Sequence, residues 1–236
     1  MEQRLTKKER RELKRREKAE QEIVQKSKKR FWRNVYVVAG VVVVVLAILG
    51  VRAILSKDVE EVSKATNDPV KGSLDAKVLI REYSDFECPA CRTSALALAK
   101  AVAGYSEEEL GYVYNDYPII QLHKNAYEAS LAAQCAYQQD KFWEYHDRLF
   151  LDQASWKDLE NPRDKFISYA TALELDVDMF TICLDEEQTK ALVEEDLNEA
   201  RDLRMNSTPT YFINGIRYVG AKSEEGWREL IDSYLK

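Results

Sequence analysis

The feature that most constrains the fold of this chain is an apolar run near its N-terminus. Residues 35–51 carry no charge, and after Arg52 the residues 53–55 continue the run. A helix over 35–55 is about 31 Å long, which matches a hydrocarbon core of roughly 30 Å. A buried helix of a soluble protein would show polar residues at helical spacing, and the run has none. The sequence therefore predicts one transmembrane helix at 35–55.

The alternative interpretation of this run is a cleaved signal peptide. The 34 residues before the run make a long n-region, the run itself exceeds the typical length, and no Ala-x-Ala motif precedes a plausible cut, so an uncleaved anchor is favoured. Residues 1–34 contain 14 Lys and Arg against 6 Asp and Glu, whereas the rest of the chain contains 21 against 35. The positive-inside rule places this basic tail in the cytoplasm and the acidic body outside it. An acidic body also argues against nucleic-acid binding.

The rest of the chain divides into a linker and one domain. Residues 56–69 are polar, lack a sustained apolar period and are predicted to be a tether. The segment 70–236 is long enough for one domain with a substantial core. Within it, 78–84 and 110–117 have the β-branched and aromatic composition of strands. Because 88–102 consists largely of helix formers, these three segments predict a strand–helix–strand unit.

The C-terminal part predicts a β-hairpin followed by a helix. Asn214-Gly215 lies between two short strand-like runs and is a strong hairpin signal. Ser223 is a suitable N-cap for a helix with apolar residues on one face. These residues are Trp227, Leu230, Ile231, Tyr234 and Leu235. The order of elements is that of a thioredoxin-type layer, and about 119–206 would form an inserted helical domain. The predicted fold class is therefore α/β, a thioredoxin fold with a helical insertion, preceded by one transmembrane helix.

The chemistry of the chain is concentrated at Cys88-Pro89-Ala90-Cys91. Proline is favoured at the first position of a helix, which would make Cys88 the N-cap. A sulfur at this place faces unpaired N–H groups and the positive end of the helix dipole, which stabilise a thiolate. The motif therefore predicts a reactive thiolate at Cys88 and a shielded partner one turn into the helix.

Two other interpretations of the cysteine motif are a zinc half-site and a structural disulfide. Cys135 and Cys183 are 48 residues apart, so they do not form a second zinc knuckle, and two His in the whole chain leave few further ligands. A structural disulfide gains little from closing so short a loop. It also leaves the strand before the motif and the helix after it unexplained.

Three segments together carry a family resemblance. They are Glu-Tyr-Ser-Asp-Phe-Glu-Cys-Pro-Ala-Cys at 82–91, Lys-Phe-Trp-Glu-Tyr-His-Asp-Arg-Leu-Phe at 141–150, and Ser-Thr-Pro-Thr-Tyr-Phe-Ile-Asn-Gly at 207–215. In this combination the domain at 70–236 resembles the DsbA-like thioredoxin-fold disulfide oxidoreductases, particularly their membrane-anchored or secreted bacterial branch.

The resemblance implies roles for five residues. Cys88 is similar to the nucleophilic cysteine that forms the mixed disulfide, and Cys91 to the resolving cysteine. Pro209 is similar to the cis-proline that faces the active-site pair, which would leave backbone groups of Thr208 free to bind a substrate chain. Glu82 matches the buried acid beneath the pair and would move the proton of Cys91.

The remaining cysteines and both histidines lie in or near the predicted insertion. Relatives in this family also carry cysteines there, so Cys135 and Cys183 are candidates for a second, non-catalytic disulfide. Four cysteines allow three pairings, and the sequence contains no distance that chooses among them. His123 lies in a turn like that of the family but with Lys124 where proline is common, and we interpret His123 and His146 as structural.

The function that the resemblance implies is oxidation of cysteine pairs in unfolded or reduced extracytoplasmic proteins. Such exchange uses the redox-active disulfide itself, with no metal or organic cofactor, and a membrane thiol oxidase would regenerate it. Reduction or isomerisation of disulfides stays open, because direction depends on the relative stability of the two redox forms. A third possibility is a membrane-tethered, chaperone-like binding module in which the cysteine pair has no redox role.

Overall fold

The computed structural model describes residues 40, 42–46 and 67–236. The chain forms two units, 1–57 and 58–236, and the second contains the domain described below. Residues 40 and 42–46 are helical and exposed. Within the described ranges, no helix is both long and apolar enough to cross a bilayer. Three predicted segments lie wholly or mostly outside these ranges: the tail 1–34, the anchor 35–55 and the linker 56–69.

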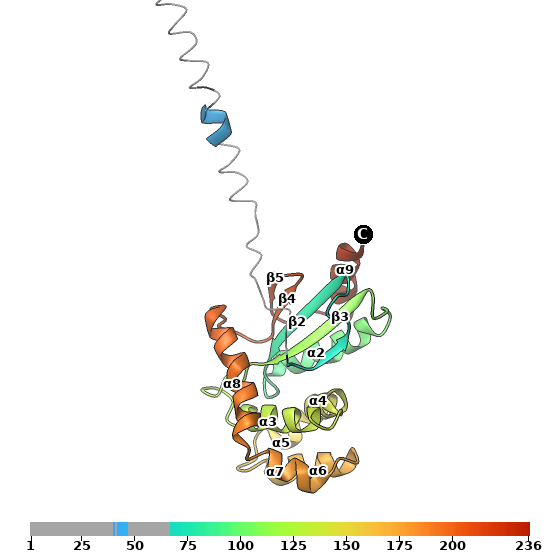
Figure 1. Cartoon of the computed structure of the whole chain (residues 1–236), viewed down its shortest axis with the longest axis vertical. Helices are drawn as coiled ribbons and strands as arrows, with labels where there is room; N and C mark the ends of the chain where they lie inside the picture. Colours follow the sequence, from blue (N-terminus) through green and yellow to red (C-terminus); the bar gives the residue numbers. More distant parts are fainter. Residues whose placement is uncertain (1–39, 41, 47–66) are drawn as a thin grey trace, which may run out of the picture. The chain divides into compact units, whose positions relative to one another are not determined.

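A five-stranded sheet forms the centre of the domain (Figure 1). The strand order is β1-β3-β2-β4-β5, with β2 and β3 parallel and the other neighbouring pairs antiparallel. The strands are β1 (Val70–Gly72), β2 (Val78–Ser84), β3 (Leu110–Asp116), β4 (Thr210–Ile213) and β5 (Ile216–Val219). The predicted strand at 78–84 and the predicted hairpin are confirmed. The strand predicted at 110–117 ends one residue earlier, and β1 was not predicted because three residues are too few to show alternation.

The turn between β4 and β5 has the conformation that its sequence favours. Asn214 and Gly215 have φ angles of 47° and 80°, and a type I′ turn requires a positive φ at both positions. The Asn214 side chain also accepts a hydrogen bond from the N–H of Leu79 at 2.8 Å. The turn is therefore joined to β2 as well as to its own hairpin.

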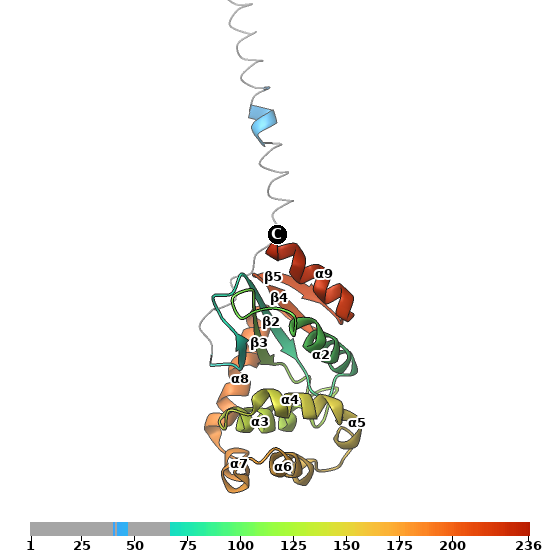
Figure 2. The same cartoon turned by 90° about the vertical axis from the view of Figure 1, so that its right-hand side faces the viewer.

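Two helices, α2 (Pro89–Val102) and α9 (Glu224–Leu235), pack together against the sheet (Figure 2). The core between them and the sheet is apolar. Its buried residues include Val78, Ile80, Leu98, Tyr211, Trp227 and Ile231. The Ser223 hydroxyl accepts a hydrogen bond from the N–H of Gly226 at 3.1 Å, so the predicted N-cap is confirmed. The helix predicted to follow the cysteine motif is α2, and this prediction is confirmed as well.

A helical insertion connects β3 to β4, as predicted. Its helices are α3 (Ala126–Tyr137), α4 (Phe142–Leu151), α5 (Gln153–Trp156), α6 (Arg163–Ala172), α7 (Val177–Cys183) and α8 (Glu187–Asp202). Figures 1 and 2 show α3 to α7 gathered beyond one end of the sheet, with α8 running back beside it. Because β2 and β3 are parallel, their carboxyl ends meet, and the loop that follows β2 contacts the start of the insertion there.

Candidate active site

The two cysteines of the motif occupy the start of α2. Cys88 has extended backbone angles (φ −69°, ψ 123°) and is the N-cap, with Pro89 at the first helical position. Both sulfur atoms are free thiols. Cys88 is 8% exposed whereas Cys91 is fully buried, so Cys88 is the cysteine that solvent reaches. The geometry is the one that the sequence predicts for a helix-terminal thiolate.

The environments of these two thiols shift their pKa values in opposite directions. A hydrogen bond from the Cys91 thiol is the largest cause, and it lowers the pKa of Cys88 to about 5. The Thr208 side chain and backbone N–H groups of the first helical turn lower it further, while burial opposes them. Burial raises the pKa of Cys91 well above its usual value, and the proximity of Cys88 adds to this effect. At neutral pH the reduced site therefore holds its negative charge on Cys88.

Thr208 and Pro209 lie opposite the Cys88 sulfur. The peptide bond between them is cis. The Cys88 sulfur lies 3.7 Å from the carbonyl oxygen of Thr208. Thr208 is half-buried, and β4 begins directly after Pro209. The structure thus brings together Cys88 and a loop that is 120 residues away in the sequence.

Glu82 lies in β2 and is fully buried. Two tyrosines donate hydrogen bonds to its carboxyl group, Tyr112 at 2.5 Å and Tyr211 at 3.0 Å. The hydroxyl group of Tyr211 also lies 2.8 Å from the Ser94 hydroxyl, three residues beyond Cys91 in α2. Burial raises the pKa of Glu82 and is the largest effect on it. Burial therefore favours the protonated form of this carboxyl group, which lies beneath the helix that carries the cysteines.

Replacing Glu82 by glutamine should stabilise the fold at neutral and alkaline pH. The folded chain keeps the proton on Glu82 at pH values where the unfolded chain has released it. Stability therefore falls as the pH rises from the ordinary pKa of the unfolded carboxyl to the raised pKa of the folded one, and Glu82→Gln removes this loss. Urea unfolding of both proteins at about pH 4 and about pH 8 measures the difference. An identical pH dependence in both would contradict a raised pKa for Glu82.

Asp85 is a buried residue near the pair that the sequence analysis missed. Its carboxylate accepts hydrogen bonds from the backbone N–H groups of Glu87 and Ile119, each at 2.7 Å. The Nδ1 atom of His123 lies 2.8 Å from the same carboxylate. The one sequence signal for Asp85 is its position, an acidic residue between the end of a strand and the cysteine motif. The sequence around His123 did not indicate that its ring contacts Asp85.

His146 lies in the core of the insertion. Its ring packs against aromatic rings at centroid distances of 4.9 to 5.8 Å. These rings are those of Phe86, Tyr114, Phe142, Trp143 and Phe150. The His146 ring is therefore enclosed by aromatic side chains.

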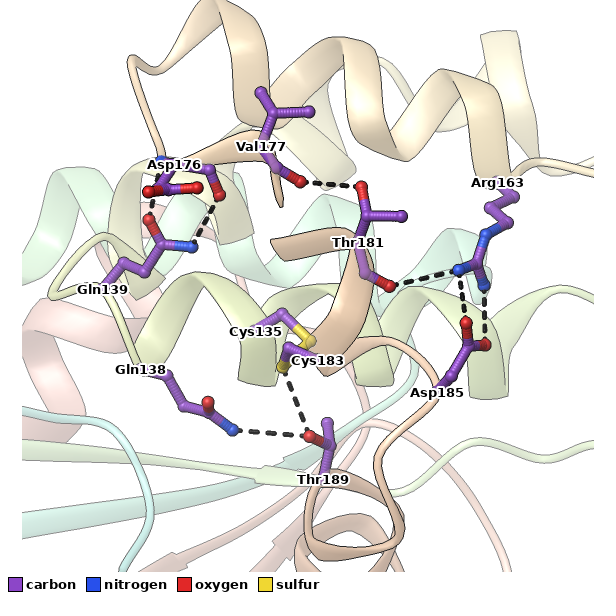
Figure 3. The surroundings of a disulfide bond; sticks show 10 residues. All are labelled: Cys135, Gln138, Gln139, Arg163, Asp176, Val177, Thr181, Cys183, Asp185 and Thr189. Carbon is purple, nitrogen blue, oxygen red and sulfur yellow. Dashed lines mark hydrogen bonds and ion pairs between the residues drawn. A yellow bond between two sulfur atoms is a disulfide. The ribbon is translucent and has the colours of Figure 1, made fainter. Parts of the chain in front are cut away.

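The other two cysteines form a disulfide inside the insertion (Figure 3). Cys135 in α3 and Cys183 in α7 have Cα atoms 5.7 Å apart, and the bond closes a 48-residue separation. The Thr189 hydroxyl lies 3.2 Å from the Cys183 sulfur. Because their sulfur atoms are joined in a disulfide, Cys135 and Cys183 do not supply thiolate ligands to zinc. Over residues 40, 42–46 and 67–236, no group of three or more His, Cys, Asp or Glu is arranged to hold a metal ion.

Similarity to curated proteins covers the domain but little of those proteins. The Na(+)/H(+) antiporter NhaA 1 of Mycolicibacterium vanbaalenii is 34% identical over 157 residues, which are 65% of this chain and 24% of the antiporter. The Na(+)/H(+) antiporter NhaA 3 of Salinispora tropica is 35% identical over 153 residues, 65% of this chain and 22% of the antiporter. The chain thus spans about a quarter of the length of the curated relatives that it matches.

Solved structures share the fold of the domain. The α-DsbA1 protein of Wolbachia pipientis is 20% identical with a TM-score of 0.63, and the match covers 72% of this chain and 92% of that one. Oxidised BdbD from Bacillus subtilis is 21% identical with a TM-score of 0.63, over 71% of this chain and 92% of that one. A thioredoxin family model matches residues 64–233. The chain therefore belongs to this thioredoxin family, and its fold is that of the DsbA-like thiol–disulfide oxidoreductases.

Proposed function

We propose that this chain is a thiol–disulfide oxidoreductase that oxidises cysteine pairs in reduced or unfolded proteins outside the cytoplasm. The observation that carries the proposal is the contrast between the two thiols of the motif. Cys88 has its pKa lowered to about 5 and is reached by solvent, whereas Cys91 is buried with a raised pKa. A stabilised thiolate at Cys88 favours the reduced form of the pair, so the disulfide form is a strong oxidant.

The reaction exchanges one disulfide for another. A substrate thiolate attacks the Cys88 sulfur of the Cys88–Cys91 disulfide, which breaks that bond and releases Cys91 as a thiolate. Cys91 then takes up a proton because its burial disfavours the charge. A second substrate thiolate attacks the substrate sulfur of the mixed disulfide and releases Cys88. The substrate loses two electrons and two protons. The pair takes up both electrons and one proton and ends as a thiolate and a thiol, and the second proton passes to solvent.

Neighbouring groups suit this sequence of steps. Glu82 lies beneath α2 with a raised pKa, so it is a suitable source of the proton for Cys91. The carbonyl of Thr208 lies beside the Cys88 sulfur, next to the cis bond to Pro209. A substrate backbone that pairs with Thr208 would bring its own cysteine to Cys88. These residues are therefore the proposed proton donor and the proposed substrate-binding segment.

The proposed location follows from the charge asymmetry of the sequence. A single transmembrane anchor at 35–55 would leave residues 1–34 in the cytoplasm and the catalytic domain outside it. A membrane thiol oxidase would then reoxidise the pair, and anchoring both proteins in one bilayer raises their effective concentration. The proposed exchange uses the sulfur atoms of the two partners and needs no metal or organic cofactor. We propose no transport activity, because the region shared with the antiporters is about a quarter of their length.

The reduction potential of the Cys88–Cys91 pair tests the proposed direction of exchange. Equilibration of the full-length chain with glutathione buffers should give a value near or above about −180 mV, as for proteins that donate disulfides. A value near about −270 mV would instead indicate a reductase. An isomerase would differ from an oxidant in also reshuffling a substrate with wrongly paired disulfides. A pair that stays inert over the whole range would favour the binding module.

A further inference from the structure

A buried carboxylate joins the two loops at the carboxyl end of the sheet. Asp85 follows the last residue of β2 and is fully buried. Its Oδ1 atom accepts the N–H of Glu87 at 2.7 Å, two residues along the same loop. Its Oδ2 atom accepts the N–H of Ile119 at 2.7 Å, in the loop that follows β3. The side chain therefore holds the segment before the cysteine motif against the entrance to the insertion.

His123 provides the third contact of this carboxylate. Its Nδ1 atom is 2.8 Å from Oδ2 of Asp85. A carboxylate that receives two backbone N–H groups acts as an acceptor, so Nδ1 of His123 carries the hydrogen. The His123 side chain is 18% exposed whereas that of Asp85 is 0% exposed. The imidazole thus lies between a buried charge and solvent.

The turn closed by Asp85 fixes the position of the Cys88 backbone. The N–H of Cys88 donates to the carbonyl of Asp85 at 3.1 Å, and the Asp85 side chain closes the same turn from within. Gln153 of the insertion donates to the carbonyl of Cys88 at 3.1 Å. These contacts hold the backbone of Cys88 at the N-terminus of α2, where N–H groups are free to stabilise a thiolate.

The charges around this turn explain why a histidine is useful there. The Glu87 carboxyl group accepts the N–H of Asn125 at 2.8 Å, so a second acidic group lies next to Cys88. Lys124 directs its ammonium group to the carbonyl of Asp158 at 3.4 Å. Like charges disfavour a thiolate. The Nδ1 donor of His123 offsets the charge of Asp85 beside the turn that carries Cys88.

We propose that Asp85 and His123 act as a positioning pair for the redox site, which holds Cys88 at the N-terminus of α2 and offsets the buried negative charge beside it. This inference rests on the proposed function for its purpose, but the ionisation of Cys88 tests it directly. The backbone of Asp85 hydrogen-bonds to Cys91, but the proposed role belongs to the side chains of Asp85 and His123. Both act through the loop that carries Cys88.

The first test is a titration of the Cys88 thiolate in the reduced full-length chain, followed by ultraviolet absorbance. His123→Ala should shift the titration to higher pH by about one unit, because Asp85 keeps its charge and loses a donor. His123→Asn should return the titration most of the way to that of the natural chain, because the asparagine amide has a donor at the place of Nδ1. Lys124→Ala, in the same loop, is the matched control and should titrate like the natural chain.

A double-mutant cycle separates this role from a general effect on stability. In an Asp85→Asn background, His123→Ala should shift the titration little, because the charge that it offsets is gone. An equal shift in both backgrounds would overturn the proposal, and so would a His123→Ala titration like that of the natural chain. If Asp85→Asn does not unfold cooperatively, the comparison of His123→Ala with His123→Asn decides alone. Loss of thermal stability without a shifted titration would show a merely structural pair.

The rate of exchange provides a second readout and separates this inference from the proposed function. Because the thiolate is the attacking species, His123→Ala should attack a small disulfide about tenfold more slowly below the titration midpoint and equally fast well above it. Equal rates at all pH values would overturn the pair. If the titrations behave as expected but the oxidised chain transfers no disulfide to a reduced peptide, the proposed function fails and the positioning pair stands.

Discussion

Replacing Cys88 by serine should abolish disulfide transfer to a reduced peptide that contains two cysteines. Without the Cys88 sulfur there is no Cys88–Cys91 disulfide for a substrate thiolate to attack, and Cys91 is fully buried with a raised pKa, so it does not replace Cys88. The loss should be several orders of magnitude in rate. Mass spectrometry of the peptide after incubation with oxidised protein measures it. A variant that keeps its full effect on unfolded proteins would support the binding module instead.

Replacing Cys91 by serine should have a different result at the same site. Cys88 keeps most of the groups that stabilise its thiolate, namely the Thr208 side chain and the helix N–H groups, although it loses the hydrogen bond from the Cys91 thiol. It should therefore react with a peptide disulfide and remain joined to one half of it, because the intramolecular resolving thiol is absent. Non-reducing electrophoresis should show this adduct for Cys91→Ser and none for Cys88→Ser. The absence of an adduct in both would contradict the assigned roles.

Removing the disulfide of the insertion should cause a large decrease in the free energy of unfolding and leave the redox site in place. A bond that closes a 48-residue separation lowers the entropy of the unfolded chain by an amount worth about 4 kcal/mol. The Cys135→Ala/Cys183→Ala variant should show this decrease in the free energy of unfolding, measured with urea under non-reducing conditions. Both sulfur atoms are buried, so lost packing adds to the effect.

Two controls define what this result means. Disulfide transfer through Cys88 should survive in the folded Cys135→Ala/Cys183→Ala variant, because the disulfide links α3 to α7 and not to α2. Mild reduction of the natural chain should convert the Cys88–Cys91 pair before the buried Cys135–Cys183 bond, which alkylation and mass mapping would show. An unchanged free energy of unfolding would mean that the bond does not form in the protein in solution.

Local signals in the sequence were sufficient to predict most strands of the sheet and the two helices that pack against it. Asn214-Gly215 predicts the β4–β5 hairpin because few residues tolerate two successive positive φ angles. Ser223 predicts the start of α9 because its hydroxyl satisfies an unpaired N–H group. Proline after Cys88 predicts the start of α2 for the same kind of local reason. Strand β1 escaped prediction because its stability comes from pairing with β3, not from its own three residues.

The candidate site also has features that the local sequence predicts and features that only the folded structure reveals. The motif and its place between a strand and a helix predict which cysteine carries the thiolate. Sequence order does not reveal that Asp85 receives groups from two loops, or that the carboxyl of Glu82 is held by tyrosines from two other strands. These contacts join residues that are 30 or more positions apart, so no local pattern records them.

The sequence by itself determined the chain's division into a basic tail, an apolar run and an acidic domain, and the position of the cysteine motif at a helix start. These follow from charge, hydrophobicity and backbone preference, which neighbouring residues set. Only the tertiary structure decided that Cys135 pairs with Cys183, that Thr208 faces Cys88, and that His123 meets Asp85. The physical reason is that a disulfide or a hydrogen bond depends on distances of a few ångströms, which packing of the whole domain establishes.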